Sequence, residues 1–75
     1  MNKIGLCIKD DEVNDLLNLC KKFNIRFKNK DQFKFHHLYL LTDTNIYYIS
    51  PIIMKNTKFS KICRSVLELN TYLEK

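Results

Sequence analysis

The sequence predicts a small α+β domain, in which two amphipathic helices lie on one face of a three- or four-stranded, mostly antiparallel sheet. Apolar and polar residues alternate near the N-terminus and through residues 25–50, which is the period of half-buried strands. Apolar residues recur every three or four positions over 13–23 and 59–73, which is the period of helices buried on one side. The predicted order is therefore β-α-β-β-β-α. Residues 1–75 form a single domain, because a chain of 75 residues has room for one core.

The N-terminal third predicts a strand followed by a helix. Apolar residues alternate with polar or small ones over residues 3–9. Asp10 or Asp11 can then cap a helix, because a short carboxylate accepts from the free amides of the first turn. The apolar stripe of this helix consists of Val13, Leu16, Leu17, Cys20 and Phe23. Asn24 suits a left-handed helix end, since asparagine tolerates positive φ.

Residues 25–50 predict a meander of three strands. In order, we expect a strand at 25–28, a turn at 29–31, a long strand at 33–41, a hairpin turn at 43–45 and a return strand at 46–49. Leu38 and Leu40 make the long strand apolar on both faces, so it should be central. Tyr47 and Tyr48 are consecutive on the return strand, and one of them must face away from the helices.

The C-terminal third predicts a second helix on the same face of the sheet. After Pro51 ends the return strand, residues 52–54 should form a buried connector or a short edge piece. The second helix should start near Phe59 or Ser60. Its apolar face consists of Phe59, Ile62, Cys63, Val66, Leu69 and Leu73.

Charge is the main functional signal, with 13 Lys and Arg against 8 Asp and Glu and a formal net charge of +5. The basic residues form two clusters along the chain, which are Lys21, Lys22, Arg26, Lys28, Lys30 and Lys34, and then Lys55, Lys58, Lys61 and Arg64. The last three are spaced to line one side of the second helix. Such clusters favour an acidic partner, whereas the phenylalanines interleaved with the first cluster also suit nucleic acid. The structural alternative is that the phenylalanines are core and the lysines are solvated surface.

From Asn14 onward, the predicted helix, three strands and helix resemble a double-stranded-RNA-binding domain in the order and length of elements. Residues 16–22 (LLNLCKK) look like the first helix of that family. Lys58, Lys61 and Arg64 correspond in position to phosphate-binding basic residues at the start of the family's last helix. The chain departs from the family in having no alanine and no Gly-Pro and His in the loop at 29–31. The resemblance implies RNA binding by the second basic cluster.

Metal binding and catalysis have weaker support. The three cysteines, Cys7, Cys20 and Cys63, lack the close-spaced pairs of structural zinc sites, so we expect no metal and no cofactor. His36 and His37 point to opposite faces of one strand. His37 with Tyr39 and Asp43, or His36 with Lys34, would be the acid–base groups of a ribonuclease-like toxin.

The composition indicates a compartment and an origin. No apolar run approaches the roughly 20 residues of a membrane-spanning helix. An odd number of cysteines is unusual for a secreted disulfide scaffold, so we expect reduced thiols in the cytoplasm. Phe, Tyr, Met, Ile, Asn and Lys, which have AT-rich codons, make up 38 of the 75 residues. This bias is typical of AT-rich genomes such as those of phages, other viruses, mobile elements and low-GC bacteria.

The function predicted first is non-enzymatic binding by a phage- or mobile-element-encoded accessory protein that docks on an acidic host protein and inhibits or redirects it. Its basic surface would consist of the two clusters, with Tyr47 or Tyr48 as an interface aromatic. A homodimer is also compatible with such a surface. The alternatives are a nucleic-acid-binding domain, RNA over DNA, and thirdly the ribonuclease-like toxin.

Overall fold

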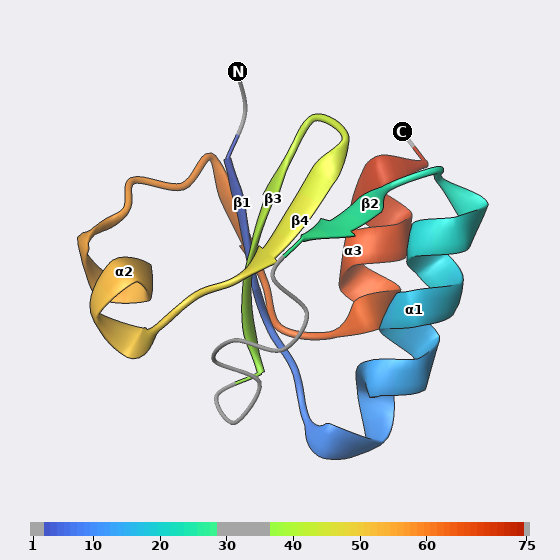
Figure 1. Cartoon of the computed structure of the whole chain (residues 1–75), viewed down its shortest axis with the longest axis horizontal. Helices are drawn as coiled ribbons and strands as arrows, with labels where there is room; N and C mark the ends of the chain where they lie inside the picture. The colour runs from blue at the N-terminus through green and yellow to red at the C-terminus, as the bar shows by residue number, and fades with distance from the viewer. Residues whose placement is uncertain (1–2, 29–36, 75) are drawn as a thin grey trace.

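A computed structural model describes residues 3–28 and 37–74, and in it a five-stranded mixed sheet carries helices on both faces (Figure 1). The α+β class predicted from the sequence is confirmed. In chain order the elements are β1 (Ile4–Cys7), the 3₁₀ turn η1 (Asp10–Glu12), α1 (Val13–Lys22), β2 (Arg26–Lys28), β3 (Leu38–Thr42), β4 (Asn45–Tyr48), α2 (Pro51–Asn56), β5 (Lys61–Cys63) and α3 (Val66–Leu73).

The strands lie in the order β2-β4-β3-β1-β5, so β3 is central, as its apolar residues predicted. β1 and β4 are antiparallel to β3, but β5 is parallel to β1 and β2 is parallel to β4. The prediction of three or four mostly antiparallel strands is therefore wrong in number and in two of the four pairings. The meander is also wrong, because β2 pairs with β4 and not with the next strand, β3.

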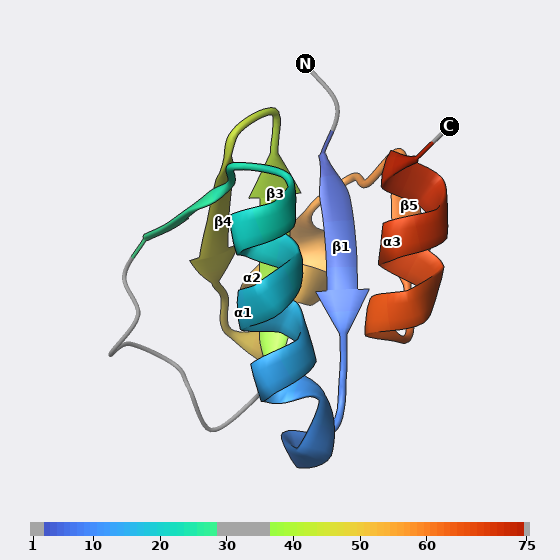
Figure 2. The same cartoon turned by 90° about the vertical axis from the view of Figure 1, so that its right-hand side faces the viewer.

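The helices α1 and α3 pack side by side on one face of the sheet, as predicted (Figure 2). We call this the helical face. Buried side chains from β1, β3, β4, β5 and both helices meet there in one core, of which Leu6, Leu16, Tyr39, Ile46, Cys63 and Leu69 are the most deeply buried. The Tyr39 ring lies 4.8 Å from the Tyr48 ring and 5.8 Å from that of Phe27, so aromatic contacts join the edge strand β2 to this core.

Both ends of α1 follow from local chemistry. A 3₁₀ turn precedes the helix, so neither Asp10 nor Asp11 caps it directly. Asn24 has φ 57°, which confirms the left-handed helix end. The amide of Ile25 donates to the carbonyl of Cys20 at 2.8 Å, and that of Asn24 donates to the carbonyl of Lys21 at 3.3 Å. These two bonds form a Schellman motif, which satisfies carbonyls that the helix leaves free.

Residues 51–56 form the short helix α2 on the other face of the sheet (Figure 1), where the sequence predicted a buried connector or edge piece. Ser50 caps this helix, since its Oγ accepts from the amide of Ile53 at 3.2 Å, and Pro51 takes the first helical position. Proline is favoured there because its missing N–H has no partner to lose. The Ser-Pro pair is thus a helix start and not only a strand end.

The second predicted helix begins later than expected. Residues 61–63 form β5, and the helix α3 starts at Val66 with Ser65 as its cap. Ser65 Oγ accepts from the amide of Glu68 at 3.0 Å, which is the cap that the Ser-x-x-Glu spacing encodes. Pairing with β1 outweighs the helical period of residues 59–63. Lys58, Lys61 and Arg64 therefore do not line a helix, and the order of elements from Asn14 on is not that of a double-stranded-RNA-binding domain.

Of the long strand predicted at 33–41, the structure describes residues 37–41, and of these residues 38–41 belong to β3. β3 begins at Leu38, and His37 precedes it with φ 48°, a backbone conformation that ends regular strand pairing. Phe33, Lys34, Phe35 and His36 lie outside the described residues. The hairpin turn at Asp43 and Thr44 is confirmed, because Thr42 and Asn45 are partners across it.

Candidate functional site

The register of the sheet defines a second face, opposite the helical face. Side chains that are partners across strands share a face, and successive residues of a strand alternate between faces. One row of partners crosses all five strands on the second face, and it consists of Lys28, Tyr47, Leu40, Gly5 and Ile62. Leu38 and Cys7 form a neighbouring pair on the same face. We call this surface of the sheet the second face, and α2 lies against it.

Gly5 lets α2 approach the middle of this row. A β-carbon at Gly5 would lie 3.2 Å from the terminal methyl of Met54 and 3.3 Å from two ring carbons of Phe59. Such contacts are tighter than ordinary van der Waals distances, so the absence of a side chain at position 5 allows both groups to pack on β1. α2 thus covers the centre of the sheet, and it also contacts β3.

The covering of the second face is incomplete on either side of Gly5. Leu38, Leu40 and Tyr47 remain partly exposed, whereas their neighbours on the helical face, Tyr39 and Leu41, are buried. At the other end of the row, Ile62 is 43% exposed. The register also shows which of Tyr47 and Tyr48 faces away from α1 and α3. It is Tyr47, because Tyr48 is the partner of Tyr39 and packs against the core.

The helix α2 adds apolar surface of its own. Ile52 is 71% exposed and Ile53 is 41% exposed, although both belong to a helix that contacts the sheet. Sequence analysis missed these residues, and Ile62, as surface groups. The Ser-Pro helix start at residues 50–51 was the available signal, because a six-residue surface helix cannot bury three consecutive apolar residues.

Charge is divided between the two sides of the molecule. The strands that build the second face, β1 to β5, and the helix α2 contain four basic residues, Arg26, Lys28, Lys55 and Lys61, and no acidic one. The segments that build the helical layer, 10–22 and 66–74, contain six acidic residues against two lysines. The second face is therefore an apolar and aromatic surface in an electropositive surrounding.

The structure separates the two predicted basic clusters. Arg26 and Lys28 are exposed on β2 at one edge of the sheet, while Lys61 lies on β5 at the other edge, where its Nζ lies 3.3 Å from Glu68 Oε2. Lys58 and Arg64 flank β5 in the chain. Lys21, Arg26 and Lys28 do meet around one groove of about 620 Å³ at the end of α1. Lys30 and Lys34 lie outside the described residues.

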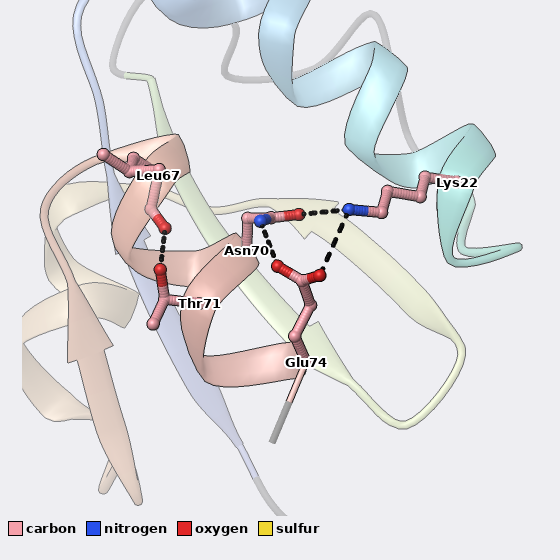
Figure 3. A network of polar contacts seen from close by, with 5 residues as sticks. All are labelled: Lys22, Leu67, Asn70, Thr71 and Glu74. Carbon is pink, nitrogen blue, oxygen red and sulfur yellow. Dashed lines mark hydrogen bonds and ion pairs between the residues drawn. The ribbon is translucent and has the colours of Figure 1, made fainter.

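Lys22 belongs to a structural contact of the helical layer. Its Nζ donates to Asn70 Oδ1 at 3.1 Å and lies 3.6 Å from Glu74 Oε2, while Asn70 Nδ2 donates to Glu74 Oε1 at 2.6 Å (Figure 3). The three residues join the end of α1 to the end of α3. Lys22, one of the binding residues predicted from the sequence, therefore has partners within the fold.

The acid–base arrangement predicted for His37 is not assembled. Tyr39 is buried in the core, and this burial raises its pKa above the ordinary tyrosine value. Asp43 lies at the opposite end of β3. His37 Nε2 instead forms an ion pair with Asp10, in the turn before α1. The pair of His36 with Lys34 lies outside the described residues.

The cysteines of the core do not offer thiolates. Burial raises the pKa of the Cys20 thiol to about 11, and burial followed by the charge of Glu68 raises that of Cys63. Both thiols are protonated at neutral pH and pack as apolar groups. Within residues 3–28 and 37–74, no three His, Cys, Asp or Glu side chains group closely enough to hold a metal ion.

Comparison with known proteins found no matching family model, no matching curated protein and no matching solved structure. Among the helices of the described residues, none has the length and apolar character needed to cross a membrane.

Proposed function

We propose that this chain is a non-enzymatic docking protein that binds an acidic surface of another protein through its second face. The observation that carries the proposal is the row that runs from Lys28 through Tyr47 and Leu40 to Ile62, in which partly exposed apolar and aromatic groups lie beside the exposed basic residues of β2. In keeping with its composition, we place the protein in the cytoplasm of a bacterial host, as a phage or mobile-element accessory protein that inhibits or redirects its target.

Two physical effects support this function, the burial of apolar groups on binding and electrostatic attraction. The apolar groups and Tyr47 supply contacts that lose water on binding, and aromatic anchors of this kind provide much of the affinity of protein interfaces. The surrounding cations steer an acidic partner toward the same face, which raises the association rate at low salt. A homodimer through this face is disfavoured, because two copies would bring like charges together.

The experiment is a pull-down with two matched double variants. Tagged protein is incubated with bacterial lysate, one half of which is treated with nuclease. The test variant, Lys28→Glu with Tyr47→Thr, changes the second face. The control, Lys9→Glu with Leu67→Thr, makes the same charge change and also removes one large apolar group, on residues that are both exposed and lie elsewhere. Far-UV circular dichroism establishes that both variants fold.

We expect the wild type and the control to retain the same protein in both halves, and the test variant to lose at least nine tenths of it. Capture that disappears after nuclease treatment would instead support RNA or DNA binding. Equal capture by the test variant would show that the second face is not the docking surface.

A further inference from the structure

On the basis of the proposed function, we infer that the partner element on the second face is an acidic amphipathic α-helix that lies beside α2, over β3 and β4. The occupant follows from three features of this face, which are the incomplete helical layer, the spacing of its apolar groups and the position of its charges.

The first feature is the incomplete layer. Sheets with two apolar faces are ordinarily covered by helices on both. Among the residues that the structure describes, two helices of ten and eight residues cover the helical face, whereas the six residues of α2, which extend about 9 Å, are the only helix on the second face. α2 is an example of a helix packed on this face, because Met54 packs on Gly5. Ile52 and Ile53 of the same helix remain exposed.

The second feature is the spacing of apolar groups beside α2. Leu38 and Leu40 are two residues apart on β3, so their side chains are about 6.6 Å apart along the strand. Tyr47 lies beside Leu40 on the next strand, at about 5 Å. One turn of an α-helix advances about 5.4 Å, so leucines three or four residues apart on a partner helix match this spacing.

The third feature is that cations lie on both sides of this patch. Arg26 and Lys28 are exposed on β2, beyond β4, and Lys55 and Lys58 are exposed in and after α2, which covers β1 and β3. A helix placed between them would have both flanks of its apolar stripe near positive charge. Carboxylates on those flanks complete the recognition. A partner β-strand would instead need free backbone groups at an edge of the sheet, whereas the patch described here lies on a face of the sheet and consists of side chains.

The test uses two synthetic peptides of identical composition. Peptide H has 18 residues, with leucines repeated at three- and four-residue spacing and with Glu and Ala elsewhere. Peptide S contains the same residues, with the leucines scrambled so that no apolar stripe forms. Binding to the whole protein is measured by fluorescence anisotropy of a dye-labelled peptide, and peptide helicity is measured by circular dichroism.

We expect peptide H to bind at least tenfold more tightly than peptide S, and to gain helicity when bound. The Lys28→Glu/Tyr47→Thr variant should weaken the binding of peptide H at least tenfold, and the Lys9→Glu/Leu67→Thr control less than twofold. The absence of binding by peptide H, or binding without a gain in helicity, would overturn the inference.

Other outcomes separate this inference from the proposed function. If both peptides bind equally and both are weakened by the second-face variant, the face docks acidic chains but does not select a helix. If peptide H binds the second-face variant as well as the wild type, the proposed function fails with the inference. Self-association of the protein alone in analytical ultracentrifugation would show that a second copy occupies the face, and would also overturn it.

Discussion

The two faces of the sheet are made by the same strands but are covered by helices to different extents. On the helical face, α1 and α3 bury the side chains of β1, β3 and β4 almost completely, and polar contacts join the two helices to each other. On the second face of the described part of the chain, α2 covers the middle, and Leu38, Leu40, Tyr47 and Ile62 remain partly or largely exposed. The comparison shows that one face holds the fold together while the other is available for contacts with another molecule.

The largest expected effect is on the helical face. Leu6 is fully buried there, so Leu6→Ala should lower the free energy of unfolding by about 3 kcal/mol. Leu40→Ala, on the second face, should cost clearly less, because Leu40 is already partly exposed. Urea denaturation followed by circular dichroism measures both. If Leu6→Ala does not fold, Ile4→Val reports on the same face at about 1 kcal/mol. Equal losses for the two leucines would contradict the difference between the faces.

A smaller effect is expected where α2 meets the sheet. Gly5→Val would place methyl groups against Met54 and Phe59, which already lie close to the missing β-carbon, at a cost of about 2 kcal/mol. Because the strain acts on α2, trypsin should cleave after Lys55 and Lys58 sooner than at sites in the helical layer. Mass spectrometry of the early fragments identifies the order. First cleavage after Lys21 or Lys22 would show that α2 is not the element displaced.

A third prediction concerns the polar links of the helical layer. One oxygen of Glu12 accepts from the amide of Val66 at 3.1 Å, at the start of α3, and the other accepts from the amide of Lys9 at 3.3 Å. Glu12→Ala should therefore lower the free energy of unfolding by about 1.5 kcal/mol, since it leaves a partly buried donor without its partner. Glu12→Gln keeps an acceptor and should lose less than half of that. Equal losses for Ala and Gln would show that charge matters here and not the hydrogen bond.

The smallest effect is a dependence on pH. The amide of Arg64 donates to Glu68 at 2.9 Å, and this bond, followed by the contact with Lys61, lowers the pKa of the Glu68 carboxyl below its ordinary value of 4.5. A lowered folded-state pKa stabilises the protein above the unfolded pKa, and the contribution is lost as pH falls through the folded value. Glu68→Gln should reduce stability near pH 7 only slightly, because exposed ion pairs contribute little to stability.

Urea titrations of the wild type and Glu68→Gln at pH 7 and pH 3 measure this difference. The two proteins should be closer in stability at pH 3 than at pH 7. A gap that stays constant over this range would mean that the carboxylate charge of Glu68 does not contribute.

The parts of the fold that the sequence predicted depend on local signals. The stripe from Val13 to Phe23 and the stop at Asn24 specify α1 without help from the rest of the chain. Residues 61–63 follow a helical period, yet they form β5, because β1 offers a partner that is distant in sequence. Pairing of this kind cannot be seen in a local pattern. Proline at position 51 has two meanings, and the structure selects the helix start.

The candidate site was predicted in its composition but not in its geometry. Tyr47 and the basic residues of β2 were candidates from the sequence, and alternation showed that one of the two tyrosines must leave the core. The register between strands was needed to place Tyr47 beside Leu40 and Lys28. The two basic clusters were predicted to form one surface, because the sequence does not show that β2 and β5 lie at opposite edges of the sheet.

The position of β1 has a consequence for how the chain folds. This strand is made first but pairs with Leu38–Leu41 and with Lys61–Cys63, so Ile4 and its partner Lys61 are 57 residues apart in the sequence. Closing so long a loop costs entropy before the pairing returns any stability, which slows folding relative to helical proteins of similar size. During synthesis, β1 therefore remains without its parallel neighbour until residue 63 has left the ribosome.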